Sequence, residues 1–257
     1  MTTVFDLTAA LQVELFAVLL TFARVGAAFM VLPGFGEPYV LSRTRLLMAL
    51  GTSVVLGLAA GPALPPPPPE VADFVRLVVI EVVMGLFIGA TVRLVLIGAH
   101  FAGAVIAMQS GLASAAFFDP AEGTQGSGIG NFLTVLTLAL IFVTDGHHLA
   151  LLGLRESYAA LPAGGLPAAD MAELFARLSA DAIFAAFRIA TPILLVGVLS
   201  NLVMGVLNRL MPTFQVMFVV MPLQIALSFG VLMLSLGVTA TLVLGLYETS
   251  LSWLAAG

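Results

Sequence analysis

The stretch GAHFAGAVIAMQSGLASAAFFDP, residues Gly98 to Pro120, decides the fold that we expect for this chain. It is apolar, but glycines interrupt it, Gln109 and Ser110 stand near its middle, and a Gly- and Ser-rich run follows over residues 121–130. Irregular backbone at membrane depth is tolerated only where protein or a water-filled cavity surrounds it. The pattern therefore predicts a re-entrant or protein-buried loop, of the kind that lines a passage.

The composition predicts an integral membrane protein. Of the 257 residues, 61% are hydrophobic and 9% are charged, with a mean hydropathy of +1.15. Soluble domains average roughly 45–50% apolar and 25% charged residues.

The net charge of -5 offers no basic face, so we expect no nucleic-acid partner. The first residues lack the positive region of a secretory signal, and we expect them to be retained as the start of a first span.

The remaining apolar runs predict about six hydrophobic helical segments, arranged as kinked hairpins. The first run, Leu15 to Leu32, carries Arg24 inside it, and the run Ile183 to Leu207 contains Pro192, where we expect a kink. The prolines at 65–69 predict a stiff, solvated spacer between two hairpins. Residues 155–181 read as a polar interruption. The arginines are divided almost evenly between the loops of the two sides, so the positive-inside rule does not orient the chain.

One face of the run Val71 to Ile97 combines charge with small residues. Residues at every fourth position of a helix share a face, and here these are Glu81, Gly85, Gly89 and Arg93. The glycines let another backbone approach closely, whereas a charge near the bilayer centre costs at least about 2.5–3.5 kcal/mol. The pattern predicts helix packing, and ion pairs between subunits through the two charged residues fit it as well.

Two kinds of site are disfavoured by the spacing of the polar residues. The cluster Asp145-Gly146-His147-His148 suggests a metal, but adjacent helical histidines point about 100° apart and no further acid or cysteine completes a tetrahedral set. Ser110, Ser114 and the histidines assemble no nucleophile with a base. We therefore expect no metal, no cofactor and no enzyme. A secondary transporter would show paired repeats and a convergent substrate site, which the sequence lacks.

Residues spread along nearly the whole chain resemble the FliR family of flagellar and type III export-gate membrane proteins. Their order and spacing carry the resemblance, and the Gly-His pair and the Phe-Phe-Asp-Pro end look more like the flagellar branch than the injectisome branch. The matching residues are Arg24-Val25-Gly26, Pro33-Gly34-Phe35-Gly36, Glu81, Gly85, Gly89, Gly103, Gln109, Gly111-Leu112, Phe117-Phe118-Asp119-Pro120, Gly146-His147, Ser157-Tyr158, Pro162, Pro192, Asn201, Arg209, Pro212 and Pro222-Leu223.

The resemblance implies a subunit of the flagellar type III export gate, a multi-pass protein of the bacterial inner membrane and the flagellar basal body. It would help to form and seal the channel through which unfolded flagellar proteins leave the cell, as a single copy among FliP-like and FliQ-like subunits and beside an FlhB-like one. Residues 1–182 would form a FliP-like part with a plug-like loop at 98–130, and residues 183–257 a FliQ-like hairpin. An injectisome homologue is the alternative.

The expected site residues fall into two sets. Apolar rings close a pore by excluding water, and Met and Phe repack readily, so the first set is the channel plug: Met108, Gln109, Gly111, Leu112, Phe117, Phe118, Asp119 and Pro120. Membrane lipid is a further expected partner of the chain as a whole. The second set packs helices or meets other subunits: Glu81, Gly85, Gly89, Arg93, Arg188, Asn201, Arg209, Pro212 and Pro222.

The chain departs from the family between Arg209 and Ile225. The family usually has Pro-Gln-x-Asn-Val-Phe there and a Lys after the second Pro, whereas this sequence has Thr213, Gln215, Met217 and Gln224 at the matching positions. The spacing from Pro212 to Pro222 is kept, so we expect the backbone path to be kept while polar contacts with neighbouring subunits change.

Overall fold

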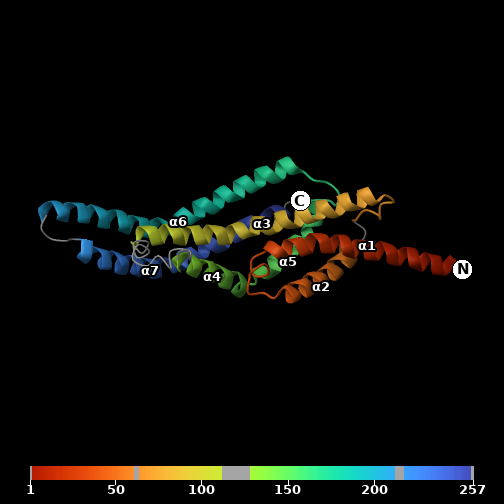
Figure 1. The fold of residues 1–257 in the computed structure, drawn as a ribbon, viewed down its shortest axis with the longest axis horizontal. Helices are drawn as coiled ribbons and strands as arrows, with labels where there is room; N and C mark the ends of the chain where they lie inside the picture. Colours follow the sequence, from red (N-terminus) through yellow and green to blue (C-terminus); the bar gives the residue numbers. More distant parts are fainter. Residues whose placement is uncertain (1, 61–63, 112–127, 212–216, 256–257) are drawn as a thin grey trace. The chain divides into compact units, whose positions relative to one another are not determined.

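The structure is a computed structural model that describes residues 2–60, 64–111, 128–211 and 217–255, all of whose regular elements are helices. The predicted all-α class is confirmed. In order along the chain, as Figure 1 shows, the helices are α1 (Thr2–Val31), α2 (Ser42–Ala60), α3 (Val71–Gln109), α4 (Gly128–Val143), α5 (Gly146–Ala160), α6 (Ala168–Leu210) and α7 (Met217–Ala255).

Fewer of these helices than expected have the length and composition of a membrane span. Three described segments qualify, Gln12–Val31, Ala168–Leu210 and Val220–Leu254, and the broken pair α4 and α5 makes a fourth if it counts as one span. The predicted number of about six is therefore not confirmed. The apolar composition and these long apolar helices both identify the chain as a membrane protein.

Residues that cannot continue a helix set most boundaries. α1 ends just before Pro33, and Gly34 then adopts the left-handed region with φ 84°. The proline run precedes α3, and Pro167 precedes α6. Asp145 separates α4 from α5 with φ 57°, a backbone conformation that Asp tolerates better than most side chains. The two helices of this region therefore replace the single apolar run that starts at Asn131.

The structure corrects the expectation that irregular chain begins at Gly98. Residues Gly98 to Gln109 are the C-terminal end of α3, a continuous helix of 39 residues. Gly98 and Gly103 do not break it because they are contact points: a Cβ at Gly98 would lie 3.0 Å from the carbonyl oxygen of Ala182, and one at Gly103 would overlap the backbone of Gly130. Residues 112–120, the second half of the predicted loop, lie outside the described residues.

The polar interruption at 155–181 is also shorter than predicted. α5 continues to Ala160 and α6 starts at Ala168, so the amphipathic segment Ala168 to Leu178 is the first part of a helix of 43 residues. Pro192 lies inside this helix and leaves the carbonyl group of Arg188 without its helical N–H donor. The predicted kink stays a prediction.

The chain forms two compact units. The first consists of Met1–Leu94, Thr144–Ser179 and Glu248–Gly257. In it α1 and α2 run in opposite directions and pack together (Figure 1), and a Cβ at Gly57 of α2 would lie only 3.1 Å from the Cα of Val18. The core of this unit contains large, fully buried side chains from several helices: Leu20, Phe29, Met84, Ile88, Leu154 and Leu254.

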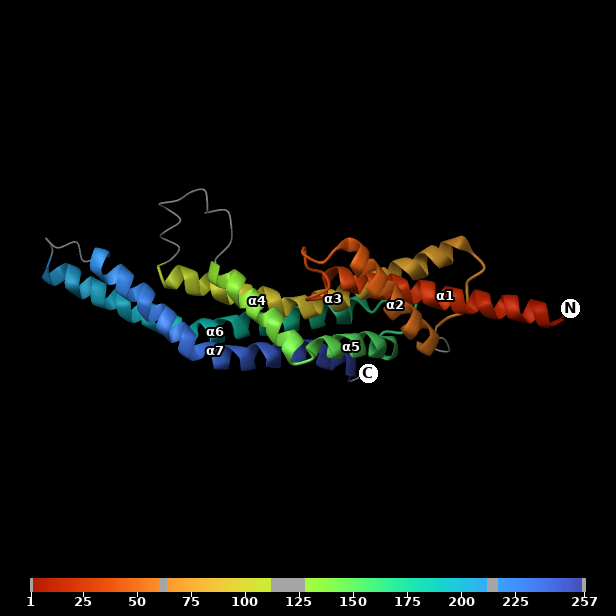
Figure 2. The same ribbon diagram turned by 90° about the horizontal axis from the view of Figure 1, so that it is seen from below.

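The second unit consists of Val95–Val143 and Ala180–Tyr247. Its α6 and α7 segments run side by side in opposite directions in both views (Figure 1, Figure 2), and the close approach at Gly103 and Gly130 joins α3 to α4. Ile106, Leu133, Ile141 and Ile193 are buried in it. The division at residue 183 into FliP-like and FliQ-like parts stays a prediction.

Candidate functional site

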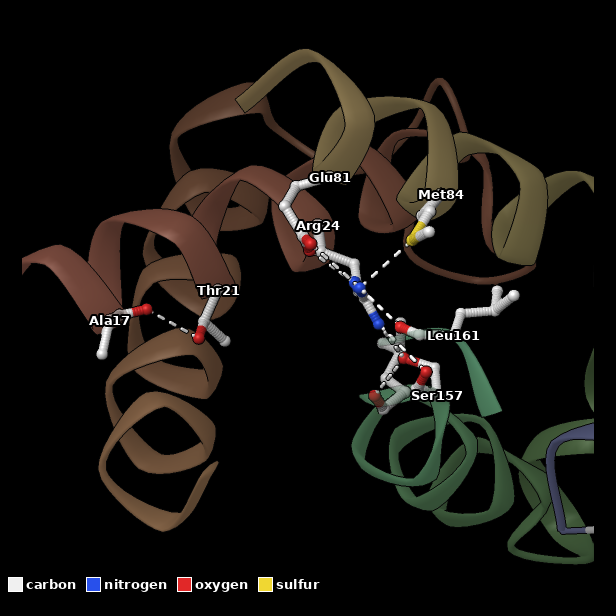
Figure 3. Close-up of polar contacts among 8 residues, drawn as sticks. Ala17, Thr21, Arg24, Glu81, Met84, Ser157 and Leu161 are labelled. Atoms are coloured by element: carbon white, nitrogen blue, oxygen red, sulfur yellow. Dashed lines mark hydrogen bonds and ion pairs between the residues drawn. The ribbon is translucent and has the colours of Figure 1, made fainter. Parts of the chain in front are cut away.

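A buried ion pair joins α1 to α3 in the first unit. The Nε atom of Arg24 donates a hydrogen bond to Oε2 of Glu81 over 2.6 Å, and Nη2 donates to Oε1 over 3.0 Å (Figure 3). Both side chains are completely shielded from solvent. This is the bidentate arrangement in which a guanidinium binds a carboxylate most specifically.

The other guanidinium hydrogens of Arg24 bind α5 and the chain that follows it. Nη1 donates to the backbone oxygen and to Oγ of Ser157, both over 3.1 Å, and Nη2 donates to the backbone oxygen of Leu161 over 3.0 Å (Figure 3). Nη2 also lies 3.1 Å from the sulfur of Met84, and the guanidinium carbon lies 3.9 Å from the ring centre of Tyr158. One side chain thus ties three helices together.

Arg24 is the residue that reasoning from sequence left out of the site. Its face on the helix predicts that Glu81 packs helices or, together with Arg93, forms ion pairs between subunits, whereas the structure pairs Glu81 with Arg24 within the chain. The signal was present, because Arg24 is the lone charge inside the first apolar run. Two opposite charges buried in two apolar helices favour each other as partners, since each otherwise bears a desolvation cost.

The face of α3 around Glu81 is packed against α1. A Cβ at Gly85 would overlap the backbone carbonyl of Arg24, and one at Gly89 would lie 2.9 Å from the carbonyl oxygen of Ala28. These contacts involve backbone atoms, which cannot swing aside as a side chain can. The structure therefore places the small residues of this face at an approach of two backbones within the chain.

Arg93, the last residue of that face, holds the turn after α1. Its Nη1 donates to the backbone oxygen of Val31 over 3.1 Å and lies 3.4 Å from Oε1 of Glu37. From α2, Arg45 donates to the carbonyl oxygens of Phe35 and Glu37 over 2.7 and 2.9 Å. Partial burial, and then the nearby Glu37 carboxylate, raise the pKa of Tyr39, which stays neutral at physiological pH.

In the second unit, the end of α3 is bound by two other helices. Gln224 of α7 donates from its side-chain Nε2 to the backbone oxygen of Gln109 over 2.7 Å. The side chain of Gln109 lies against Gly197 of α6 so closely that a Cβ there would overlap it. The C-terminal carbonyl groups of a helix have no intrahelical partner. The Gln224 amide supplies one from a distant part of the sequence.

The described part of the predicted plug begins at this point. Met108 exposes 74% of its surface, whereas Gln109 is half-buried. Gly111 follows with φ 81°, next to Met221, and so ends the helix in the left-handed conformation that glycine adopts without strain. The remaining plug residues lie outside the described part of the chain: Leu112, Phe117, Phe118, Asp119 and Pro120.

The predicted contact residues of α6 and α7 are exposed. Arg188, Asn201, Arg209 and Pro222 all lie on the surface, and Pro212 falls outside the described residues. Large apolar side chains surround them on the same two helices, among them Phe184, Leu195, Leu199, Leu202, Met233 and Leu234. Neither arginine forms an ion pair in the described ranges.

The polar cluster at the start of α5 comes closer together than its spacing predicted. One ligand atom each from Asp145, His147 and His148 lie within 4.8 Å of one another, and the ring centres of the two histidines are 4.1 Å apart. Ligands about 2.1 Å from a tetrahedral zinc ion lie about 3.4 Å apart, and a structural zinc site needs four of them. The described residues supply three, two of them exposed, so the geometry alone assigns no metal here.

Comparison with known proteins places this arrangement in a family. The model for bacterial export proteins, family 1, matches residues 15–250. The chain is similar to the flagellar biosynthetic protein FliR of Caulobacter vibrioides, with 33% identity over 87% of this chain and 89% of that protein. The proteins of the same name from Bacillus subtilis (28%, 93% of each chain) and Escherichia coli (27%, 81% and 80%) are also similar. Because the match extends over almost every described helix, the chain belongs to family 1 of the bacterial export proteins.

Proposed function

We propose that this chain is a subunit of the flagellar type III protein export gate in the bacterial inner membrane. The observation that carries the proposal is the family match over residues 15–250, together with relatives named as flagellar biosynthetic proteins. The described helices are consistent with it, since several are long and apolar enough to cross a membrane. On this proposal the chain is a structural component of a channel and not an enzyme.

The exposed surface of α6 and α7 supports assembly with other subunits. Leu199, Leu202 and Leu234 expose 63%, 64% and 87% of their surface, and Arg188 and Arg209 stand on the same helices. Lipid would satisfy the leucines but not the charges, whose exposure to hydrocarbon is costly. Neighbouring helices that offer acidic side chains or carbonyl groups would satisfy both. We propose FliP-like, FliQ-like and FlhB-like subunits as these neighbours.

The end of α3 supports a role in closing the channel. Met108 is exposed there, and the segment leading to Phe117 and Phe118 follows from an anchored helix end at Gln109. An apolar constriction can exclude water and ions, and Met and Phe side chains can repack around a passing chain. On this proposal the segment 98–130 seals the closed gate against ions.

A secretion assay tests the proposed function. The gene is deleted in its own bacterium, and flagellin and hook protein are measured in the medium and on the cell surface, with and without a plasmid copy. We expect the deletion to abolish export and motility and the plasmid to restore both. Normal flagella in the deleted strain would contradict the proposal, and normal flagella with lost secretion of other proteins would favour the injectisome alternative.

A further inference from the structure

A cavity of about 550 Å³ opens between α2 and α5 of the first unit. Val55 and Leu56 line it from α2, and Leu151 and Leu152 line it from α5. Nothing lies within 4 Å of a Cβ built on Gly51, which forms part of the same wall. Its size is within the roughly 300–1,000 Å³ typical of small-ligand pockets. The cavity is therefore large enough for a ligand and is almost wholly apolar.

Two basic side chains border this apolar space, and they differ in their surroundings. His148 and Arg155 line the cavity from one stripe of α5, because positions i, i+4 and i+7 of a helix share a face. Nδ1 of His148 lies 3.6 Å from the Asp145 carboxylate, so an anion at that end would meet an acid. Arg155 forms no ion pair with any described acid, its sequence neighbour Glu156 included. The favourable place for an anion is the Arg155 end.

Three arginines of this unit, Arg43, Arg76 and Arg155, bind no described residue, and of these three Arg155 lines the cavity. Arg24, Arg45, Arg93 and Arg177 each bind a carboxylate or a backbone oxygen. Arg155 makes no hydrogen bond or ion pair with any described residue. A guanidinium presents five N–H donors in a planar fork that matches a phosphate in a bidentate manner. A guanidinium that binds no described residue and borders an apolar cavity fits a ligand with an anionic head and an apolar tail.

The volume of the cavity distinguishes a lipid chain from a partner helix. Two turns of an α-helix about 10 Å in diameter and about 11 Å long occupy roughly 850 Å³, more than the whole cavity. A helix would therefore lie across the opening and leave the space beside Gly51 unfilled. A single acyl chain is narrower and can occupy that space.

We propose that the α2–α5 cavity is a binding site for an anionic phospholipid. One acyl chain lies along Val55, Leu56, Leu151 and Leu152, and the phosphodiester accepts hydrogen bonds from Arg155. Basic pockets between helices of membrane proteins bind anionic lipid head groups in this manner. The proposal requires only that the chain resides in a bilayer, so it does not depend on which proteins the gate exports.

Photo-crosslinking in the assembled complex tests this site. The complex is purified with its partner subunits, placed in nanodiscs, and exposed to phosphatidylglycerol or phosphatidylcholine that carries a photoreactive group on one acyl chain. We expect phosphatidylglycerol to label peptides of α2 and α5 more strongly than phosphatidylcholine. Arg155→Gln should lower the phosphatidylglycerol label about five-fold, and Arg155→Lys, which keeps the charge but not the planar fork, should lower it less. Arg76→Gln, which changes an exposed arginine outside the cavity, should have no effect.

A second variant tests the apolar part of the site without changing charge. Gly51→Phe adds bulk to the wall of the cavity and should abolish labelling by both lipids, whereas Gly205→Phe, at another glycine with open space around its Cβ, should not. The yield of complex confirms that each variant is folded. Equal labelling by the two lipids would overturn the head-group assignment. Labels absent from α2 and α5, with a partner peptide chemically crosslinked there instead, would show that a protein segment covers the cavity.

Discussion

The Nε atom of Arg24 and the carboxylate of Glu81 lie 2.6 Å apart and join two helices across 57 residues of sequence, with neither side chain reaching solvent. The pair needs no other subunit, because Ser157 and Leu161 accept the remaining hydrogen bonds. Helices α1 and α3 are therefore bound to α5 by contacts made within the chain.

Breaking this pair should be strongly destabilising. Glu81→Gln leaves the guanidinium buried without a counter-charge, a change that typically costs about 3–5 kcal/mol. We expect a sharp loss of folded complex and a lower Tm in a thermal unfolding assay. The matched control is Glu173→Gln, which breaks the exposed pair of Glu173 with Arg177 and should cost about 0–1 kcal/mol. Equal losses of stability from the two substitutions would show that the buried pair contributes no more to the fold than an exposed pair does.

The backbone approach of α1 and α3 should tolerate no side-chain bulk. Gly85→Leu and Gly89→Leu place atoms where the carbonyl groups of Arg24 and Ala28 lie, so we expect little complex to be recovered. Gly51→Leu is the control, since Gly51 faces open space, and it should leave the yield unchanged. A normal yield from Gly89→Leu would mean that this face has been misplaced.

Loop glycines make a poorer control for this experiment than Gly51. Gly164 has φ 87°, and a Cβ there would lie 3.1 Å from Cδ2 of Leu77, so a substitution at this position is strained for its own reasons. Gly61, another loop glycine, lies outside the described residues. Whether a glycine lies in a helix or in a loop does not predict how well it tolerates a larger side chain, because the atoms that surround its Cβ position decide that.

The hydrogen bond from Gln224 to Gln109 should limit the leakage of ions through the closed gate. Gln224→Glu preserves the shape of the side chain but removes the N–H donor, which leaves a helix-end carbonyl unsatisfied at a cost of roughly 1–3 kcal/mol. Gln224→Lys restores a donor. We expect the Glu variant to raise ion leakage through the assembled gate in liposomes and the Lys variant to leak less than the Glu variant. The same leakage from both would show that this bond does not hold the plug segment.

Composition and apolar runs were sufficient to predict an all-helical membrane protein. A chain that crosses lipid needs long apolar segments, and a helix satisfies the backbone hydrogen bonds of such a segment within itself. The end of α3 was not predictable in the same way. Gly98 and Gly103 looked like breaks, but each fits against another helix, at Ala182 and Gly130, and a sequence does not show which distant backbone fills the space beside a glycine.

The candidate site was predictable in its residue types and not in its pairings. Glu81, Gly85, Gly89 and Arg93 lie on one face, as their spacing requires, but pairing Glu81 with Arg24 needs the knowledge that α1 lies against α3. The bond between Gln224 and Gln109 spans 115 residues and leaves no periodic signal in the sequence. The structure supplies these long-range relationships.

Two phenylalanines that follow α3 provide a direct test of sealing. Phe117→Ala combined with Phe118→Ala removes apolar bulk from the proposed constriction, so we expect ion leakage to rise while the complex still assembles. Conductance across a bilayer containing purified complexes is the measurement. An unchanged leak in intact complexes would assign these side chains to ordinary packing.

The central claim is that this chain functions as one subunit of a membrane complex and is not self-sufficient, since Arg188 and Arg209 are exposed among apolar side chains. The most direct measurement compares the chain expressed alone with the chain expressed together with FliP-like and FliQ-like subunits, by size-exclusion chromatography and native mass spectrometry in detergent. The account predicts aggregation or degradation of the chain alone, and a stable complex containing one copy of it when the partners are present. A monodisperse, thermally stable monomer that binds neither partner would contradict the account.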